Sequence, residues 1–277
     1  MSAVSEFLIV IALIVLLWFA WFATGGPERF RDSQGIFLSE SSFNENGSSN
    51  LPWDSNQHPF AQYIDIEANG AQNNTPSSEY ISISSAWNTP EDINLTGWTL
   101  RNEKEERVII GFGTKTPRQG SQNNPEDIIL SRGGGAIVTT GRSPIGISFG
   151  VNICSGYIGT LQTFTPHLST SCPTALDMAQ ARGVNVDDSQ CKTALRRIPS
   201  CTTQTERVPD DVSGECGDFL REDINYNTCV RAYTNTYNFD EGQWRIFLGR
   251  DTELWNDKSD TISLYDEKGE LVTSVKY

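Results

Sequence analysis

The chain has 277 residues and a formal net charge of -14, from 35 acidic and 21 basic side chains. Its length leaves room for one large domain or two small ones. The acidic excess argues against a nucleic-acid partner, because phosphate backbones are bound by Lys and Arg that displace counterions. The charge itself is explained by the solubility of an exposed protein and identifies no ligand.

An uncharged apolar run from Phe7 to Ala23 is the first feature along the chain. As a helix it would extend roughly 25 Å, which just spans the hydrocarbon core of a bilayer. Aromatic residues gather at its C-terminal end, and Gly25-Gly26-Pro27 stops the helix. We therefore predict that residues 1–25 form one transmembrane anchor. A cleaved signal peptide is the main alternative, although no Lys or Arg precedes the run; a buried soluble helix is another.

Residues 26–59 form the second segment, which is rich in Gly, Ser, Asn and Glu with isolated aromatic residues. Its apolar content is too low for independent folding, so a flexible tether is predicted.

Hydrophobic residues then alternate with a period of two, as in half-buried antiparallel strands. The pattern fills residues 60–142, stops, and returns over residues 243–277, where Asp266 to Gly269 form the turn of a C-terminal hairpin. We predict a mainly β fold in which these two segments build one sandwich. The expected strands cover 63–67, 79–84, 97–102, 107–110, 127–130, 135–140, 244–249, 260–265 and 270–277. The expected core residues are Ile81, Ile83, Trp98, Leu100, Trp244, Ile262 and Leu264.

Residues 143–242 interrupt the β pattern and contain every cysteine of the chain. Helices are predicted over 188–198, where Asp188 is a capping residue, and over 213–224. The six cysteines are Cys154, Cys172, Cys191, Cys201, Cys216 and Cys229. An even number in one cluster is typical of disulfides, whose pairing the sequence leaves open among about 15 connectivities. We expect a small, partly helical insertion stapled by these bonds.

The direction of insertion into the membrane rests on two features that disagree. Arg29 and Arg31 follow the apolar run and mildly favour a cytoplasmic body. Disulfides persist outside the reducing cytosol, so the cysteine cluster favours a body outside the cytoplasm. We give the cysteines more weight and predict a single-pass protein whose C-terminal domain is extracytoplasmic.

The β segments resemble the lamin-tail domain, the immunoglobulin-like sandwich at the end of nuclear lamins and in many exported prokaryotic proteins. The resemblance is carried by residues 79–83, 93–100, 130–138 and 254–277. It implies an immunoglobulin-like sandwich with Trp98 as the central core residue, and Gly97 before it for a tight turn. The chain has no heptad rod and no C-terminal prenylation box, and the cysteine-bearing insertion departs from the family's minimal pattern. It is most similar to the membrane-anchored prokaryotic type, and the resemblance supplies no function.

Motifs of known chemistry are weak in this chain. Only His58 and His167 are available as imidazole bases, and neither stands in a catalytic motif. The cysteines lack the spacing of a zinc site, the acidic pairs lack the pattern of a calcium loop, and Gly133 to Gly135 lack the lysine of a phosphate loop. We predict no catalytic residue, no metal ligand and no cofactor.

Two functions remain for the chain. The first is a non-catalytic, membrane-anchored extracytoplasmic module for surface presentation, adhesion or protein binding, with a protein or glycan partner. The alternative is an envelope hydrolase that acts on polysaccharide or peptidoglycan through carboxylates near the insertion. Residues 143–242 either recognise the partner or merely cover part of the sandwich.

Overall fold

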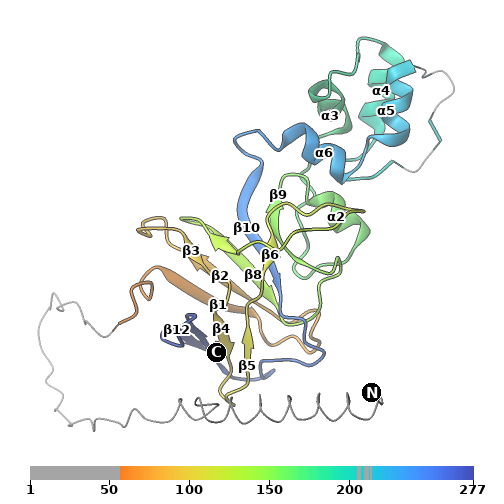
Figure 1. Ribbon diagram of the computed structural model, residues 1–277. Coiled ribbons are helices and arrows are strands. Elements are labelled where there is room, and N and C mark those ends of the chain that lie inside the picture. The colour runs from red at the N-terminus through yellow and green to blue at the C-terminus, as the bar shows by residue number, and fades with distance from the viewer. Residues whose placement is uncertain (1–56, 205–206, 209–211, 213) are drawn as a thin grey trace, which may run out of the picture. The chain divides into compact units, whose positions relative to one another are not determined.

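The computed structural model describes residues 57–277, except 205–206, 209–211 and 213 (Figure 1). These residues belong to one compact unit that extends from Asp54 to Tyr277. The predicted anchor, residues 1–25, and nearly all of the predicted tether, residues 26–59, lie outside the described residues. Among the residues that are described, no helix is long and apolar enough to cross a membrane.

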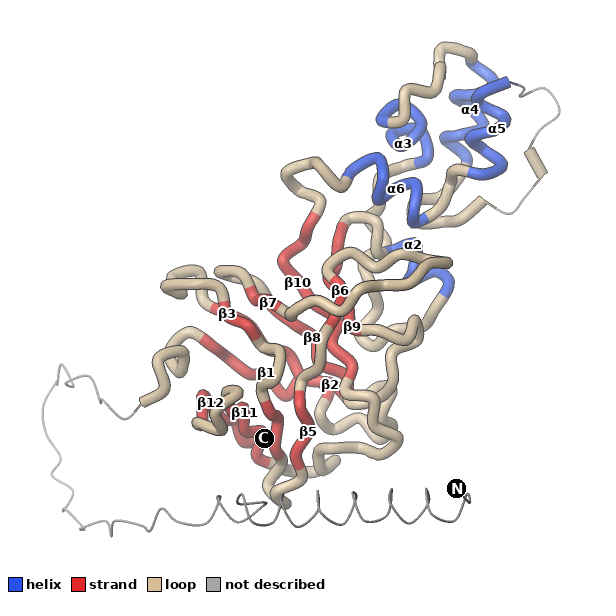
Figure 2. Tube along the Cα trace, in the orientation of Figure 1, coloured by secondary structure: helices blue, strands red, loops and turns tan. Residues whose placement is uncertain are grey.

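The strands form two principal sheets and one short two-stranded ladder (Figure 2). The six-stranded sheet has the order β1-β2-β8-β10-β9-β6, and the four-stranded sheet has the order β12-β11-β4-β5. Two pairings are parallel, β10 with β8 and β6 with β9, and the other pairings between named strands are antiparallel. The first sheet contains β1 (Ile64–Gly70), β2 (Tyr80–Ser85), β8 (Gly135–Thr139), β10 (Asp240–Phe247), β9 (Ser148–Asn152) and β6 (Gly113–Thr114). The second contains β12 (Leu271–Lys276), β11 (Thr261–Tyr265), β4 (Thr99–Arg101) and β5 (Arg107–Ile109), and the ladder joins β3 (Ile93–Asn94) to β7 (Ile129–Leu130).

One hydrophobic cluster takes side chains from both principal sheets, so the arrangement is sandwich-like. All seven expected core residues belong to it and are at most 5% exposed: Ile81, Ile83, Trp98, Leu100, Trp244, Ile262 and Leu264. The alternation explains this burial, since Ile81 and Ile83 point inward from β2 while Ser82 and Ser84 remain accessible. The Trp244 indole nitrogen donates a hydrogen bond to the carbonyl oxygen of Ile129 at 2.9 Å, which satisfies its polar atom.

The predicted C-terminal hairpin is present and is an internal part of its sheet. β11 lies between β12 and β4, so its loss would remove the centre of the four-stranded sheet. In the turn, Asp266 Oδ1 accepts hydrogen bonds from the backbone nitrogens of Lys268 and Glu270. Gly269 has a φ of +82°, a conformation that favours glycine.

The cysteine-bearing segment is partly helical, as expected. It contains α2 (Gly156–Leu161), α3 (Ala175–Ala181), α4 (Ser189–Arg197), α5 (Gly214–Glu222) and α6 (Tyr226–Tyr233). The two predicted helices correspond to α4 and α5, and the Asp188 side chain caps α4 by accepting from the nitrogens of Gln190 and Cys191. The other three helices were not predicted, and one of them, α6, contains Cys229.

The sheet extends past the boundaries drawn from the sequence. Residues 148–152, assigned to the insertion, form β9, which pairs with β10 and β6, and β10 begins at Asp240. The part outside the sandwich is therefore residues 153–239. This segment builds a second hydrophobic cluster of its own, which shares Phe149 and Val151 of β9.

All six cysteines are paired, which confirms the predicted disulfides and gives their connectivity. The bonds are Cys154–Cys229, Cys172–Cys201 and Cys191–Cys216. The first bond joins α6 to the chain just after β9. Each bond closes a long loop of the unfolded chain and is worth about 3–5 kcal/mol in the chain-entropy account.

Candidate functional site

A cavity of about 900 Å³ lies between residues 115–126, the loop that follows β6, and helix α6. We call it the amide groove, because Asn and Gln side chains are frequent in its wall. In Figure 1 the loop leaves β6 and reaches towards α2. The groove is lined by Thr114, Lys115, Thr116, Pro117, Arg118, Gln119, Ser121, Gln122, Asn123, Asn124, Glu126, Asn227, Val230, Arg231 and Thr234.

Two asparagine side chains hold the loop backbone in place. The Asn227 side chain of α6 accepts a hydrogen bond from the backbone nitrogen of Gln119 at 3.2 Å and donates one to the backbone carbonyl oxygen of Gln119 at 3.0 Å. Asn123 makes the same pair of bonds to the backbone of Arg118, at 2.7 and 3.2 Å. Because each amide satisfies both a donor and an acceptor of the backbone, the loop is fixed without being a strand or a helix.

Several other polar side chains of the groove have unused hydrogen-bonding capacity. Within the described residues, the side chains of Arg118, Gln119, Gln122 and Asn124 make no hydrogen bond or ion pair to the protein. They are accessible to solvent at the wall of the cavity. An amide presents both donors and an acceptor, so these groups suit a ligand that also donates and accepts.

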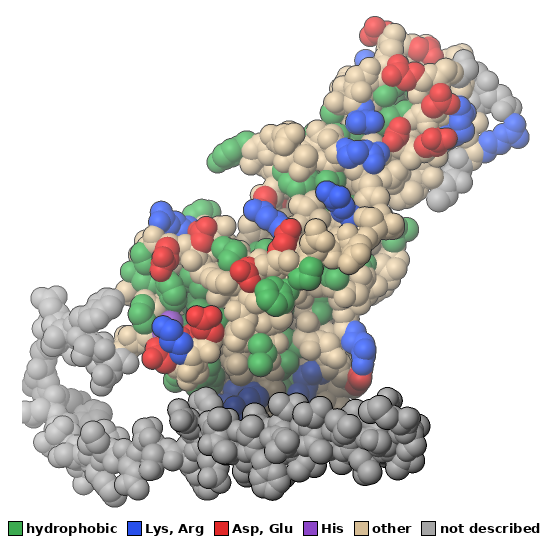
Figure 3. All heavy atoms as spheres, viewed as in Figure 1, with side chains coloured by type: hydrophobic (Ala, Val, Ile, Leu, Met, Phe, Trp, Pro, Cys, Tyr) green, Lys and Arg blue, Asp and Glu red, His purple; other side chains and the backbone are tan. Residues whose placement is uncertain are grey.

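The charged groups of the groove are largely occupied by other parts of the protein. Lys115 Nζ is 2.9 Å from Asp240 Oδ2, and Arg231 is 3.3 Å from Asp223 Oδ1. Glu126 Oε2 accepts a hydrogen bond from the backbone nitrogen of Lys115 at 2.8 Å. On the face that Figure 3 shows, acidic and basic side chains are interspersed rather than gathered into one patch.

A second cavity, of about 520 Å³, adjoins the amide groove and shares Thr114 and Asn123 with it. We call it the aromatic cavity, since Phe112 and Phe247 line it together with Pro125 and Ile147. Phe112 is 62% exposed, so its ring is accessible from solvent at this cavity.

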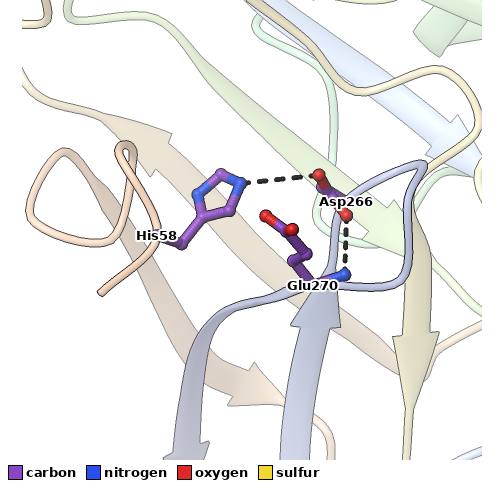
Figure 4. Close-up of side chains that lie close together, drawn as sticks. All are labelled: His58, Asp266 and Glu270. Carbon is purple, nitrogen blue, oxygen red and sulfur yellow. Dashed lines mark hydrogen bonds and ion pairs between the residues drawn. The ribbon is translucent and has the colours of Figure 1, made fainter. Parts of the chain in front are cut away.

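His58, Asp266 and Glu270 form a separate cluster, shown in Figure 4, whose ligand-type atoms lie within 4.8 Å of one another. His58 Nε2 is 3.6 Å from Asp266 Oδ2, beyond hydrogen-bond range but compatible with two ligands of one metal ion. Both side chains are less than a tenth exposed.

The other nitrogen of His58 argues against a metal in this cluster. Nδ1 accepts a hydrogen bond from the Phe60 backbone nitrogen at 3.2 Å, so the neutral ring carries its proton on Nε2. When a histidine binds a metal through one ring nitrogen, the N–H of its other ring nitrogen donates a hydrogen bond to an acceptor. In His58 that other nitrogen is Nδ1, and it faces the N–H donor of Phe60. The ring also lies edge-on to Trp98, with centroids 6.2 Å apart. His58 therefore ties the start of the described chain to the sandwich, although the sequence placed it in the flexible tether.

His167 is positioned by a buried arginine rather than by a catalytic partner. Arg245 of β10 donates to the carbonyl oxygens of Pro166 and His167 at 2.7 and 3.1 Å. Burial lowers the pKa of the Arg245 guanidinium to about 10. The structure thus places His58 and His167 in different parts of the fold, and it brings neither to the amide groove.

Comparison with known proteins found no matching family model, curated protein or solved structure.

The sequence did not single out the amide groove. The sequence pattern predicts only a connection between two strands over residues 115–126, and it predicts no helix at α6. The available signal was the run of Pro, Gln, Asn and Ser between residues 116 and 125, which is long for the link between two adjacent strands.

Proposed function

We propose that this chain is a non-catalytic extracytoplasmic module that binds a partner through the amide groove. In this proposal residues 1–25 anchor it to a membrane, and the β part is an immunoglobulin-like sandwich of the lamin-tail type. The three disulfides support a location outside the reducing cytosol.

One observation carries the proposal: a loop with a fixed backbone presents unpaired amides beside a covalently anchored helix. Asn227 of α6 holds the loop at Gln119, and the Cys154–Cys229 disulfide holds α6 to the end of β9. A wall that is ordered before binding loses less conformational entropy when a partner is captured. Functional residues also concentrate on loops that a rigid scaffold positions.

The arrangement of acids supports binding over hydrolysis. Glycoside hydrolysis requires two carboxyl groups that flank the scissile bond. Among the described residues that line the amide groove, Glu126 is the one acidic residue, and its carboxylate accepts from the loop backbone. The hydrolase alternative would need a partner for Glu126 from outside this wall.

The test measures retention of isolated cell envelopes on beads that carry the full chain in detergent micelles. A triple variant, Gln119→Ala with Gln122→Ala and Asn124→Ala, should lose most of the retention, because it removes the free amides and leaves Asn123 and Asn227 in place. The matched control is Asn235→Ala with Asn238→Ala, two exposed amides that line no described cavity. Equal retention by the triple variant and the wild type would refute the binding role of the groove.

The same incubation tests hydrolysis. The proposal predicts no release of reducing ends or of free amino groups from the envelopes. Release that disappears in a Glu126→Gln variant would instead establish the hydrolase alternative.

A further inference from the structure

The amide groove and the aromatic cavity have complementary chemistry and share part of their wall. Thr114 and Asn123 line both, so one extended ligand can contact the amides of the first and the rings of the second. Both volumes, about 900 and 520 Å³, fall in the range of pockets that bind small molecules or single units of a polymer.

We infer that the ligand is a neutral glycan chain, with one sugar ring packed on Phe112 and its hydroxyl groups bonded by Gln119, Gln122 and Asn124. This inference rests on the proposed function and names the class of partner for the same site. A sugar ring has an apolar C–H face and an edge of hydroxyl groups that both donate and accept. The adjacent cavities offer an exposed ring and unpaired amides that match these two surfaces.

Charge favours a neutral glycan over an anionic one. The whole chain carries a formal net charge of -14, which repels a polyanion at long range. Lys115 and Arg231 already pair with Asp240 and Asp223, so Arg118 is the one basic side chain of the described groove wall without an ion pair. As a donor of several N–H groups, Arg118 also suits hydroxyl oxygens.

The groove fits a peptide less well. Extended peptides are usually bound by pairing with a strand edge or by pockets for alternate side chains. The loop of the amide groove lies outside every named strand over residues 115–126, and the apolar residues of the groove wall are Pro117 and Val230. A protein partner would therefore find few apolar contacts in the amide groove itself.

The decisive experiment treats the envelope preparation before it meets the full chain in micelles. Periodate, which cleaves the vicinal diols of sugars, should abolish retention, whereas protease digestion should leave it unchanged. Loss of retention after protease, with survival after periodate, overturns the glycan inference and leaves the proposed binding function intact. If no envelope preparation is retained by the wild type, the proposed function itself fails.

Two variants locate the sugar ring. Phe112→Ala should weaken retention of protease-treated envelopes about tenfold, the equivalent of about 1.4 kcal/mol. Tyr237→Ala, which removes a fully exposed ring that lines no described cavity, should leave retention unchanged. Retention that is unaffected by Phe112→Ala, or reduced equally by the two variants, would overturn the assignment of the ring to the aromatic cavity. Circular dichroism of each variant separates loss of binding from loss of fold.

Discussion

Glu79 provides a sharp test of the packing between the two segments of the β part. Glu79 has no exposed surface, and its two carboxylate oxygens accept hydrogen bonds from the backbone nitrogens of Leu254 and Trp255, at 2.8 and 3.0 Å. Leu254 and Trp255 belong to the same core cluster as the sandwich residues. One buried side chain of the first β segment thus fixes the connection between β10 and β11.

Replacing Glu79 by Gln keeps the shape but changes one acceptor oxygen into a donor. One of the two backbone N–H groups would then face an NH2 group in a buried site, which costs about 1–3 kcal/mol. Glu267→Gln is the matched control, since Glu267 is exposed and makes no hydrogen bond within the described residues. The control should change the free energy of unfolding by less than about 0.5 kcal/mol.

The difference in free energy of unfolding between the wild type and Glu79→Gln should also depend on pH. Burial, helped by the nearby charge of Glu253, raises the pKa of the Glu79 carboxyl above its ordinary value, against the opposing effect of the hydrogen bonds that it accepts from the backbone nitrogens of Leu254 and Trp255. A carboxyl with a raised folded-state pKa adds stability as the pH falls through that pKa towards the unfolded-state value, about 4.3. Glutamine does not titrate, so only the wild type gains this stability. The difference in free energy of unfolding between the two proteins should therefore widen as the pH is lowered from 7.

Urea unfolding of both proteins at several pH values measures this gap, and groups common to the two proteins cancel in the difference. A gap that narrows on acidification would mean that the hydrogen bonds outweigh burial and that the folded-state pKa is lowered. An unchanged free energy of unfolding at pH 7 would mean that the hydrogen bonds from Glu79 to the β10–β11 connection contribute nothing to stability.

Four further predictions address the core, the hairpin, the disulfides and the cysteine-bearing segment. Trp98→Ala should cost about 3–5 kcal/mol in urea unfolding, because the buried ring leaves a cavity; a cost below about 1 kcal/mol would contradict its core position. Truncation after Gly249 should abolish cooperative unfolding, since it removes β11 and β12, and a truncated chain that still melts cooperatively would refute the sandwich assignment. Thiol labelling of the unreduced protein should modify essentially none of the six cysteines, and labelling of all six would place the body in a reducing compartment. Replacing residues 153–239 by a short Gly-Ser turn should leave the sandwich folded and eliminate envelope retention, because Asn152 and Asp240 are paired neighbours that a turn can join; loss of folding would show that the segment covers the sandwich instead.

Much of the β part was predictable because its signal is local. A period of two places Ile81 and Ile83 on one face of a strand, independently of the rest of the chain. Asp266 and Gly269 are residue types favoured at the first and last positions of a turn. Helices α4 and α5 were found from a capping residue and helical spacing. The capping box of α3, in which Thr174 and Asp177 bond each other's backbone, was also present but precedes a short helix with little periodicity.

The candidate site was not predictable because its parts are distant in sequence. Gln119 and Asn227 meet only after β6 pairs with β9, β9 pairs with β10, and a disulfide places α6. The number of cysteines indicates that disulfides form but does not say which pairs form. His58 was misplaced for the same reason, since its contacts with Trp98 and Asp266 lie far along the chain.

The separation of the two hydrophobic clusters links the disulfides to the proposed binding site rather than to the stability of the sandwich. The cluster between the two principal sheets contains no cysteine, whereas all six cysteines belong to the cluster of the inserted segment. Reduction should therefore loosen α6 while the sandwich remains folded. Because Asn227 holds the loop backbone from α6, loosening the helix also frees one side of the amide groove. If the groove binds as proposed, mild reduction lowers envelope retention before it changes the near-ultraviolet signal of the buried tryptophans, and the opposite order would mean that retention does not depend on the placement of α6.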